Sequence, residues 1–279
     1  MPSAQITDYF DQWSPSKIKT LRQCPLKYYL QYIKKMKIET PASQDTTARD
    51  AGKALHSILE YMAKGLTHPE AVLKTKMEYK KGMDEWQKYV EPNLYNVRRF
   101  VERFEEFSKV NPVEKLCPEV KLGVRRDWSL CDFFAPDVYF RGIVDLTILL
   151  KNKDAIVIDH KKGGTAEFGL KNYEAQLNPY KILVLAKFPH VQNVSAGIHF
   201  VEEGTVPIGN KTSAEQIIEM ERPKLVYDIN CGVEAVQELG VFKHKRGSYC
   251  KYCDYNEICK AKEYGSFEKE SIPILESLK

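Results

Sequence analysis

The chain has 279 residues, of which 43% are hydrophobic and 29% charged, with 15 Gly and 14 Pro. This balance is typical of one large folded domain, or of a core with a small appended module, and excludes collagen-like, low-complexity and wholly disordered chains. A formal net charge of +4 permits nucleic acid as a partner without indicating one. The apolar stretches are far shorter than a membrane span and the first residues lack a signal-peptide pattern, so we expect a soluble, cytoplasmic protein without a membrane partner.

The first third of the sequence has the pattern of helices. Ser14-Pro15-Ser16 forms a cap, and the apolar spacing that follows as far as Lys37 is interrupted at Pro25, so two short helices are expected. Apolar residues then recur at intervals of three and four in two longer segments, which predicts amphipathic helices carrying Leu55, Ile58, Leu59, Met62 and Leu66, and Val97, Phe100, Val101, Phe104 and Phe107.

The middle of the sequence has the pattern of strands. Alternation and β-branched runs predict strands over residues 119–124, 142–150, 155–159 and 194–201. Helices are expected over residues 169–187, with a kink at Pro179, and over residues 213–239. The predicted fold class is therefore α/β, with a central mixed sheet flanked by helices and an N-terminal helical region.

The seven cysteines divide into a cluster and isolated residues. Because their number is odd and no secretory signal precedes them, a disulfide framework is not expected. Cys250, Cys253 and Cys259 fall within ten residues, and with one remote partner they suit a tetrathiolate site for Zn²⁺ or an iron–sulfur cluster. Spacing alone does not choose between these two. Three others lack partners at ligand spacing and are expected to be small buried hydrophobic residues: Cys117, Cys131 and Cys231.

Two neighbouring predicted strands carry the residues best suited to catalysis. Asp145 lies on one, and on the other Asp159 and Lys161 project to the same face while His160 points away. Two carboxylates at strand ends form a hard-oxygen site for Mg²⁺ or Mn²⁺, and a nearby Lys can orient or deprotonate an attacking water and stabilise charge on a phosphate. This is the chemistry of phosphodiester hydrolysis. The tripeptide alone is weak support, because surface strands often end in Asp-x-Lys as solvated charge.

Four residues elsewhere are compatible with such a site. Gln176 and Tyr180 lie one turn apart on a predicted helix, where their polar tips can touch a phosphate or a base. His56 lies beside the apolar stripe of an earlier helix and is available as a metal ligand. Glu119 precedes the first alternating strand and is a candidate further acid. Singly, each is more commonly a solvated or structural residue, so the combination carries the hypothesis.

Four motifs follow one another in the chain: Gly52-x3-His56, Gly142-x2-Asp145, Asp159-His160-Lys161 and Gln176-x3-Tyr180. Their order, from about residue 14 to residue 260, resembles that of the PD-(D/E)XK nuclease superfamily in its RecB-like exonuclease branch. The early Cys24 and the late Cys250-x2-Cys253-x5-Cys259 resemble the four-cysteine iron–sulfur signature of AddB-type and CRISPR-associated nucleases.

The resemblance implies a restriction-endonuclease-like core with an iron–sulfur staple at its C-terminal end. It implies one nuclease domain over residues 1–262, composed of a helical part (about 14–110), a catalytic α/β core (about 115–205) and a C-terminal helix with the cysteine cluster (about 213–262). A polar tail over residues 263–279 would follow.

The resemblance also implies a role for each candidate residue. The ligands of Mg²⁺ or Mn²⁺ would be His56, Asp145 and Asp159, with the carbonyl of His160 and Glu119 as further candidates. Lys161 would serve the attacking water, while Gln176 and Tyr180 would bind the substrate. A 4Fe-4S cluster, favoured over Zn²⁺, would be held by Cys24, Cys250, Cys253 and Cys259.

The function implied is that of a metal-dependent DNA exonuclease in recombination, repair or end processing. Its partner would be DNA, as single strands or duplex ends, together with a recombination or repair protein. Two alternatives stay open: a DNA-end-binding module of a larger complex that cuts poorly, and a structure-selective endonuclease.

Overall fold

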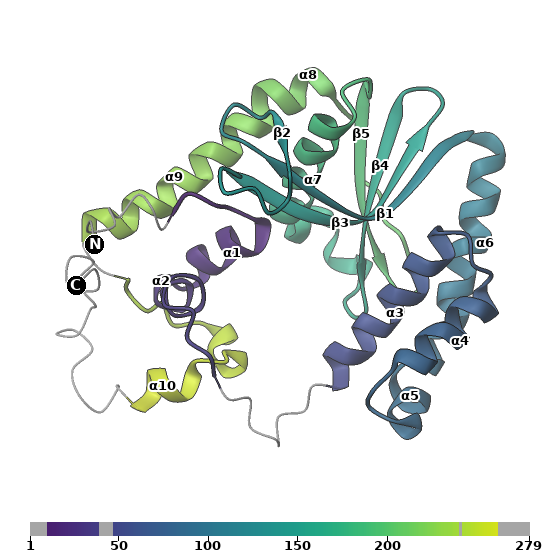
Figure 1. Ribbon diagram of the computed structural model, residues 1–279, viewed down its shortest axis with the longest axis horizontal. Helices are drawn as coiled ribbons and strands as arrows, with labels where there is room; N and C mark the ends of the chain where they lie inside the picture. Colours follow the sequence, from purple (N-terminus) through teal and green to yellow (C-terminus); the bar gives the residue numbers. More distant parts are fainter. Residues whose placement is uncertain (1–9, 39–46, 240–241, 262–279) are drawn as a thin grey trace.

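A computed structural model describes residues 10–38, 47–239 and 242–261 of the chain. At its centre lies a six-stranded mixed sheet with the strand order β2-β1-β3-β4-β5-β6 (Figure 1). The strands are β1 (Val113–Val124), β2 (Leu130–Cys131), β3 (Phe140–Leu150), β4 (Asp154–Lys161), β5 (Asn193–Phe200) and β6 (Thr212–Ser213). The α/β fold class expected from the sequence is confirmed.

The sheet combines antiparallel and parallel pairing. β1, β3 and β4 form an antiparallel meander, whereas β4 and β5 are parallel and are joined by the crossover helix α7 (Glu174–Lys187). The register of β3 with β4 runs from Leu149 opposite Ala155 to Leu146 opposite Ile158, and no further. The pairing of β3 with β4 therefore ends at Leu146, and the two strands are no longer paired at its neighbour Asp145.

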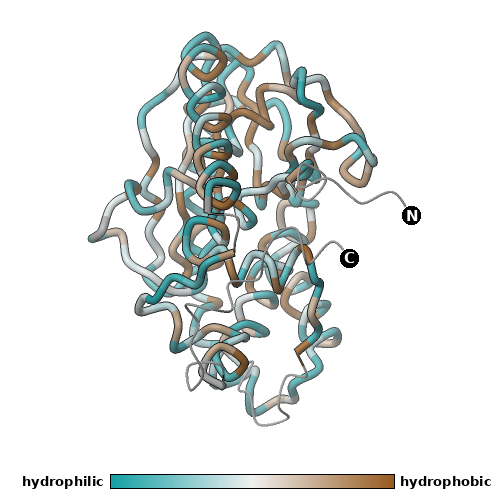
Figure 2. The backbone as a smooth tube through the Cα atoms, turned by 90° about the vertical axis from the view of Figure 1, so that its left-hand side faces the viewer, coloured by the Kyte–Doolittle hydropathy of each residue, from teal (hydrophilic) through white to brown (hydrophobic). Residues whose placement is uncertain are grey.

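Alternation along the strands supplies a core on each face of the sheet. On one face, Leu146, Ile148 and Leu150 pack with the long helix α6 (Leu94–Val110). On the other face, Leu149, which alternates with Ile148 and Leu150, belongs to the main core with the buried residues of α7. The helical coils in Figure 2 alternate between hydrophobic and hydrophilic residues, as expected for helices that bury one face.

The helices on the α6 side form a layer of their own. α3 (Thr47–Ala63) packs against β1 and β3, and α4 (His68–Glu78) packs against α3. α5 (Met83–Tyr89) closes this layer with Trp86, which is 1% exposed. Hydrophobic periodicity in the sequence predicted α3 and α6 but neither α4 nor α5.

The two ends of the described chain meet on the opposite side of the molecule. α1 (Pro15–Gln23) and α2 (Pro25–Tyr28) are the two expected short helices, and a π-helical turn (Tyr29–Ile33) follows them. The C-terminal part comprises α8 (Ala214–Gln216), a π-helical turn (Ile217–Glu221), α9 (Arg222–Leu239) and α10 (Asn256–Ala261). Leu26 N donates to the carbonyl of Lys243 at 3.3 Å, so distant segments lie side by side.

Two further expectations concern α7 and the tail. The helix begins at Glu174 rather than at residue 169, because two short 3₁₀ turns separated by Gly169 (φ 60°) precede it. Pro179 lies inside the helix, which continues past it to Lys187. The predicted polar tail lies outside the described residues. Among the described residues, the longest apolar helical windows fall short of what crossing a membrane requires.

Candidate active site

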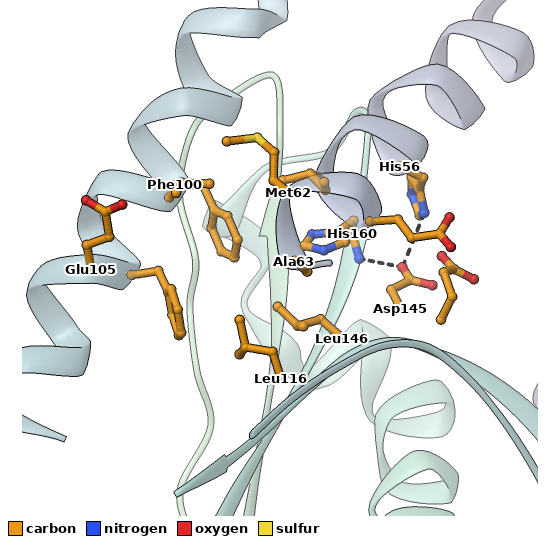
Figure 3. A pocket seen from close by; sticks show the side chains of 14 residues that line it. His56, Met62, Ala63, Phe100, Glu105, Leu116, Asp145, Leu146 and His160 are labelled. Carbon is orange, nitrogen blue, oxygen red and sulfur yellow. Dashed lines mark hydrogen bonds and ion pairs between the residues drawn. The ribbon is translucent and has the colours of Figure 1, made fainter. Parts of the chain in front are cut away.

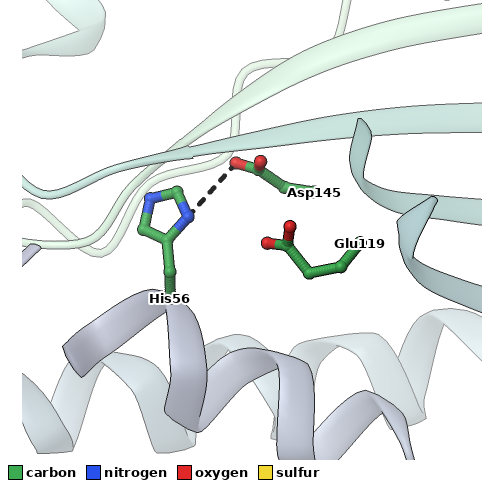
Figure 4. Close-up of side chains that lie close together, drawn as sticks. All are labelled: His56, Glu119 and Asp145. Atoms are coloured by element: carbon green, nitrogen blue, oxygen red, sulfur yellow. Dashed lines mark ion pairs between the residues drawn. The ribbon is translucent and has the colours of Figure 1, made fainter. Parts of the chain in front are cut away.

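Three side chains from separate elements converge where β3 leaves β4. They are His56 of α3, Glu119 of β1 and Asp145 of β3, and one potential ligand atom from each lies within 4.8 Å of the others (Figure 4). Nδ1 of His56 stands 3.5 Å from Oδ2 of Asp145. An imidazole nitrogen with two carboxylates is a donor set that fits a divalent cation such as Mn²⁺ or Mg²⁺.

The backbone of Glu119 has a left-handed conformation. Its φ is 49°, and the paired residues on either side of it are Pro118 opposite Leu146 and Val120 opposite Val144. Glu119 therefore interrupts the ladder opposite Asp145. A non-glycine residue with positive φ inside a strand costs roughly 1–3 kcal/mol, and such strain concentrates at functional sites. The interruption brings the two carboxylates together.

Burial and the neighbouring acid together change the titration of Glu119. Burial of the half-buried carboxyl raises its pKa to about 7, and the negative charge of Asp145 adds to the effect. The charge of Glu60, one turn after His56 on α3, acts in the same direction. Glu60 was not among the residues predicted from the sequence, although its i+4 spacing from His56 places it on the same face of α3.

Asp145 also joins the two strands where their ladder ends. The backbone N–H of His160 donates to Oδ2 of Asp145 at 2.8 Å, in place of a regular interstrand bond. The His160 ring lies 3.0 Å from that of His199, Nδ1 to Nδ1, and its burial holds its pKa well below the usual range. This neutral ring therefore belongs to the packing beside the site.

A small cavity adjoins the three ligand residues. It has a volume of about 190 Å³ and lies between α3, α6 and the sheet (Figure 3). His56, Asp145 and Glu119 occupy one end, and the rest of its wall is largely apolar, with Leu59, Met62, Phe100, Phe104, Leu116 and Leu146. The apolar wall lowers the dielectric around the carboxylates, which strengthens their attraction for a cation.

The second group of predicted residues surrounds Asp159. This carboxylate is 2% exposed; Nζ of Lys161 lies 2.6 Å from Oδ2, and Nε2 of Gln176 donates to Oδ1 at 2.7 Å. Burial raises the pKa of Asp159 to about 6, the charge of Asp145 adds to the rise, and Lys161 opposes it. Asp159 and Lys161 share one face of β4, as the period of a strand predicts.

Tyr180 lies one turn beyond Gln176 on α7. Its hydroxyl is 3.4 Å from Nε2 of Gln176, and its ring is buried, which raises its pKa. The structure thus brings together Asp159, Lys161, Gln176 and Tyr180 as one set and His56, Glu119 and Asp145 as another. Asp159 is absent from the closest group of potential ligands among the described residues.

Gly142 explains how closely α7 approaches the sheet. A Cβ atom at this position would lie 3.0 Å from Cδ1 of Leu183 and 3.1 Å from Cε1 of Tyr180. Any larger residue would require the side chains of Leu183 and Tyr180 on α7 to move by a few tenths of an ångström. The glycine of the Gly-x-x-Asp motif therefore sets the position of the helix that carries Gln176.

The four cysteines of the predicted cluster come from the two ends that meet. Cys24 precedes α2, while Cys250, Cys253 and Cys259 lie on or beside the C-terminal turn and α10. The hydroxyl of Tyr249 donates to the carbonyl of Gln23 at 2.5 Å, which holds the residues next to Cys24 and Cys250 together. All seven cysteines fall within the described residues, and none forms a disulfide.

A mixed sheet that presents acids and a lysine where two strands separate is the core of a restriction-endonuclease-like hydrolase. The model of the PD-(D/E)XK nuclease superfamily matches residues 12–260, and the chain belongs to this superfamily. Its nucleases are hydrolases that act on nucleic acids with divalent metals.

Two solved structures align with this chain at low sequence identity. The protein SSO0001 is 15% identical, with a TM-score of 0.39 over 90% of this chain and 87% of that one. A protein of Eubacterium rectale named "Putative exonuclease" is 13% identical, with a TM-score of 0.48 over 99% and 96% of the two chains. A search of curated proteins finds no match.

Proposed function

We propose that this protein is a metal-dependent DNA exonuclease of the RecB-like branch, acting in recombination, repair or end processing. The observation that carries the proposal is the buried Asp159, held by Lys161 and Gln176 beside the group of His56, Glu119 and Asp145. Three acids, one lysine and one imidazole from four elements match the needs of phosphodiester hydrolysis.

Each residue in this proposal has a distinct task. His56, Glu119 and Asp145 hold Mg²⁺ or Mn²⁺, and Asp159 and the carbonyl of His160 are the further ligands expected from the sequence. A bound divalent ion polarises a phosphoryl oxygen and lowers the pKa of bound water. Lys161, whose position is fixed by its ion pair with Asp159, orients the attacking water and stabilises the developing charge. The substrate strand is positioned by Gln176 and Tyr180.

We further propose that Cys24, Cys250, Cys253 and Cys259 hold a 4Fe-4S cluster that joins the ends of one nuclease domain. The contact between Tyr249 and Gln23 supports the proximity of the two segments, and the N–H of Gly247 points at Sγ of Cys250 at 3.4 Å. Structural zinc sites more often use two Cys-x2-Cys pairs, whereas this chain offers one such pair and two single cysteines. This spacing and the resemblance to four-cysteine nucleases favour the iron–sulfur cluster.

The experiment that tests the proposed activity is a cleavage assay with labelled DNA. Single-stranded and duplex DNA, labelled at the 5′ or the 3′ end, is incubated with Mg²⁺, Mn²⁺ or a chelator. Lys161→Ala is compared with Lys162→Ala, because Lys162 is the next residue but pairs with Glu202 at 2.9 Å instead. Cleavage should need the metal, fall by at least about 100-fold in Lys161→Ala and persist in Lys162→Ala.

Other results would change the assignment in defined ways. Equal cleavage by Lys161→Ala and the unmodified protein would refute the assigned site. Cutting of closed circular DNA would identify an endonuclease, because an exonuclease needs an end. Binding of DNA ends without cleavage under any metal would identify the end-binding module.

A further inference from the structure

A large groove in the described part of the molecule runs from the site towards the cysteine segments. Its volume is about 980 Å³, and its walls come from α1, β3, α7 and the turn that contains Tyr249. Its lining includes Lys161 and Gln176, which contact Asp159, and also Lys245 and Tyr249, which contact the end of α1. The groove therefore connects Asp159 with the region where the two ends of the chain meet.

Every charged side chain on this groove is positive. The five are Lys19, Arg22, Arg141, Lys161 and Lys245, and no Asp or Glu of the described residues lines it. The cavity beside His56 has the opposite character, because neither lysine nor arginine is among its described lining residues and four carboxylates are: Glu60, Glu105, Glu119 and Asp145. A polyanion is thus attracted along the groove and meets the cation-binding carboxylates only at its end.

Three of these cations have no negative partner among the residues that the structure describes. Within the described residues, Lys19, Arg141 and Lys245 form no ion pair with a carboxylate, whereas Arg22 is paired with Asp228 at 2.6 Å. Nη1 of Arg141 donates to the carbonyl of Phe133 at 3.0 Å, and Nζ of Lys245 donates to the carbonyl of Arg22 at 3.4 Å. Carbonyl bonds fix the direction of these side chains but leave their charge available to a ligand.

The charge of the groove also acts on a neighbouring residue. Burial lowers the pKa of Lys17 to about 8, and the positive charges of Arg141 and Lys35 contribute to the shift. A phosphate bound near Arg141 would relieve this repulsion. The groove thus has a positive potential in the absence of a ligand, as a binding site for phosphates requires.

We propose that this groove binds a single strand of nucleic acid and leads its phosphates from Lys245 to Lys161. The proposal rests on the proposed function and specifies its substrate as an unpaired strand. The volume lies at the upper end of the range that encloses one drug-sized ligand, so it accommodates a few nucleotides of one strand rather than a duplex. Half-buried rings of Tyr173 and Tyr249 on its walls offer faces on which unpaired bases can stack, and the guanidinium of Arg141 already lies over the Phe133 ring, 5.1 Å from its centre.

The test measures binding without cleavage. A labelled single-stranded oligonucleotide is titrated in chelator at several salt concentrations, and the slope of log affinity against log salt is determined by fluorescence anisotropy. The double variant Lys19→Ala, Lys245→Ala removes two exposed cations of the groove. Its slope should be shallower by about 1.4, because each lost phosphate contact on a single strand contributes about 0.7.

The matched control removes the same charge elsewhere. Lys109→Ala with Lys151→Ala changes two exposed lysines that do not line the groove, one on α6 and one in the turn after β3, and the slope should stay that of the unmodified protein. Equal slopes for groove and control variants would overturn the proposal, as would a blunt duplex that binds more tightly than the single strand. If the protein cleaves DNA but these slopes are equal, strand binding in the groove is refuted and the proposed nuclease activity is supported. If it never cleaves DNA but the slopes differ as expected, strand binding in the groove is supported and the proposed nuclease activity is refuted.

Discussion

Gln176 on α7 donates a hydrogen bond of 2.7 Å to Oδ1 of Asp159 on β4. The other oxygen of this carboxylate lies 2.6 Å from Nζ of Lys161, so the acid is held on both sides by groups that favour its charged form. This support is needed because burial raises the pKa of Asp159 to about 6. The glutamine therefore connects the crossover helix to the ionisation of the acid that positions Lys161.

Replacing Gln176 should reveal this connection. We expect Gln176→Ala to lower the cleavage rate about 10- to 100-fold, because a hydrogen bond to a charged group contributes about 1.5–3 kcal/mol. Loss of the donor raises the pKa of Asp159 further, so the acidic limb of the pH–rate profile should move to higher pH. Single-turnover rates across pH measure both effects. Gln192→Ala, at an exposed glutamine, is the control, and a Gln176→Ala profile identical to it would refute the role.

Glu119 should destabilise the metal-free protein at alkaline pH. Its folded-state pKa of about 7 exceeds the ordinary value of 4.5, so the folded chain binds more protons between these values and loses stability as pH rises through 7. After allowance for solvent screening of a half-exposed carboxyl, we expect Glu119→Gln to stabilise the metal-free protein at pH 8 by about 1 kcal/mol. That corresponds to an increase in Tm of about 2–4 °C.

Bound metal should make the unmodified protein more stable than Glu119→Gln, the reverse of the order expected without metal. Added Mn²⁺ should raise the Tm of the unmodified protein but have little effect on Glu119→Gln, because the neutral amide is a poor ligand. Thermal unfolding at pH 4.5 and pH 8, with and without Mn²⁺, measures these differences. The same metal-induced shift in both proteins would show that Glu119 is not a ligand.

A methyl group at Gly142 should displace α7. Gly142→Ala places a Cβ 3.0 Å from Cδ1 of Leu183, and overpacking of this kind costs about 1–3 kcal/mol. Because α7 also carries Gln176, the cleavage rate should fall together with the Tm. Leu183→Val shortens the opposing side chain, so the double variant should lose less stability than the sum of the single changes. Strict additivity would show that the contact with Leu183 does not limit the approach of α7.

The cysteine assignment predicts selective loss of iron. Cys253→Ser should give colourless protein without bound iron and acid-labile sulfide, and its Tm should fall by about 5 °C or more, the equivalent of about 2 kcal/mol. Cys131→Ser, at the short edge strand β2, is the control that should keep the cluster. Iron retained by Cys253→Ser, or zinc in place of iron in the unmodified protein, would contradict the assignment.

Part of this site could be predicted from the sequence, because the geometry of single strands and helices fixes which nearby residues share a face. The two-residue period of a strand predicts that Asp159 and Lys161 share a face, and the helical period predicts that Gln176 and Tyr180 do so; the distances of 2.6 and 3.4 Å agree. Hydrophobic periodicity likewise predicted α3, α6 and the central strands. These features depend on neighbours within about four residues, whose geometry the backbone fixes.

The tertiary structure alone decided the rest, because it depends on contacts between distant segments. The left-handed φ of 49° at Glu119 exists only where β1 pairs with β3, and nothing in the sequence around that residue indicates it. The convergence of His56 with Asp145 needs α3 to pack on the sheet. The uniformly positive groove needs the C-terminal turn to return to α1, which the spacing of Cys24 and Cys250 suggested but could not place. Such long-range arrangements follow from the packing of the whole chain rather than from the periodicity of any one segment.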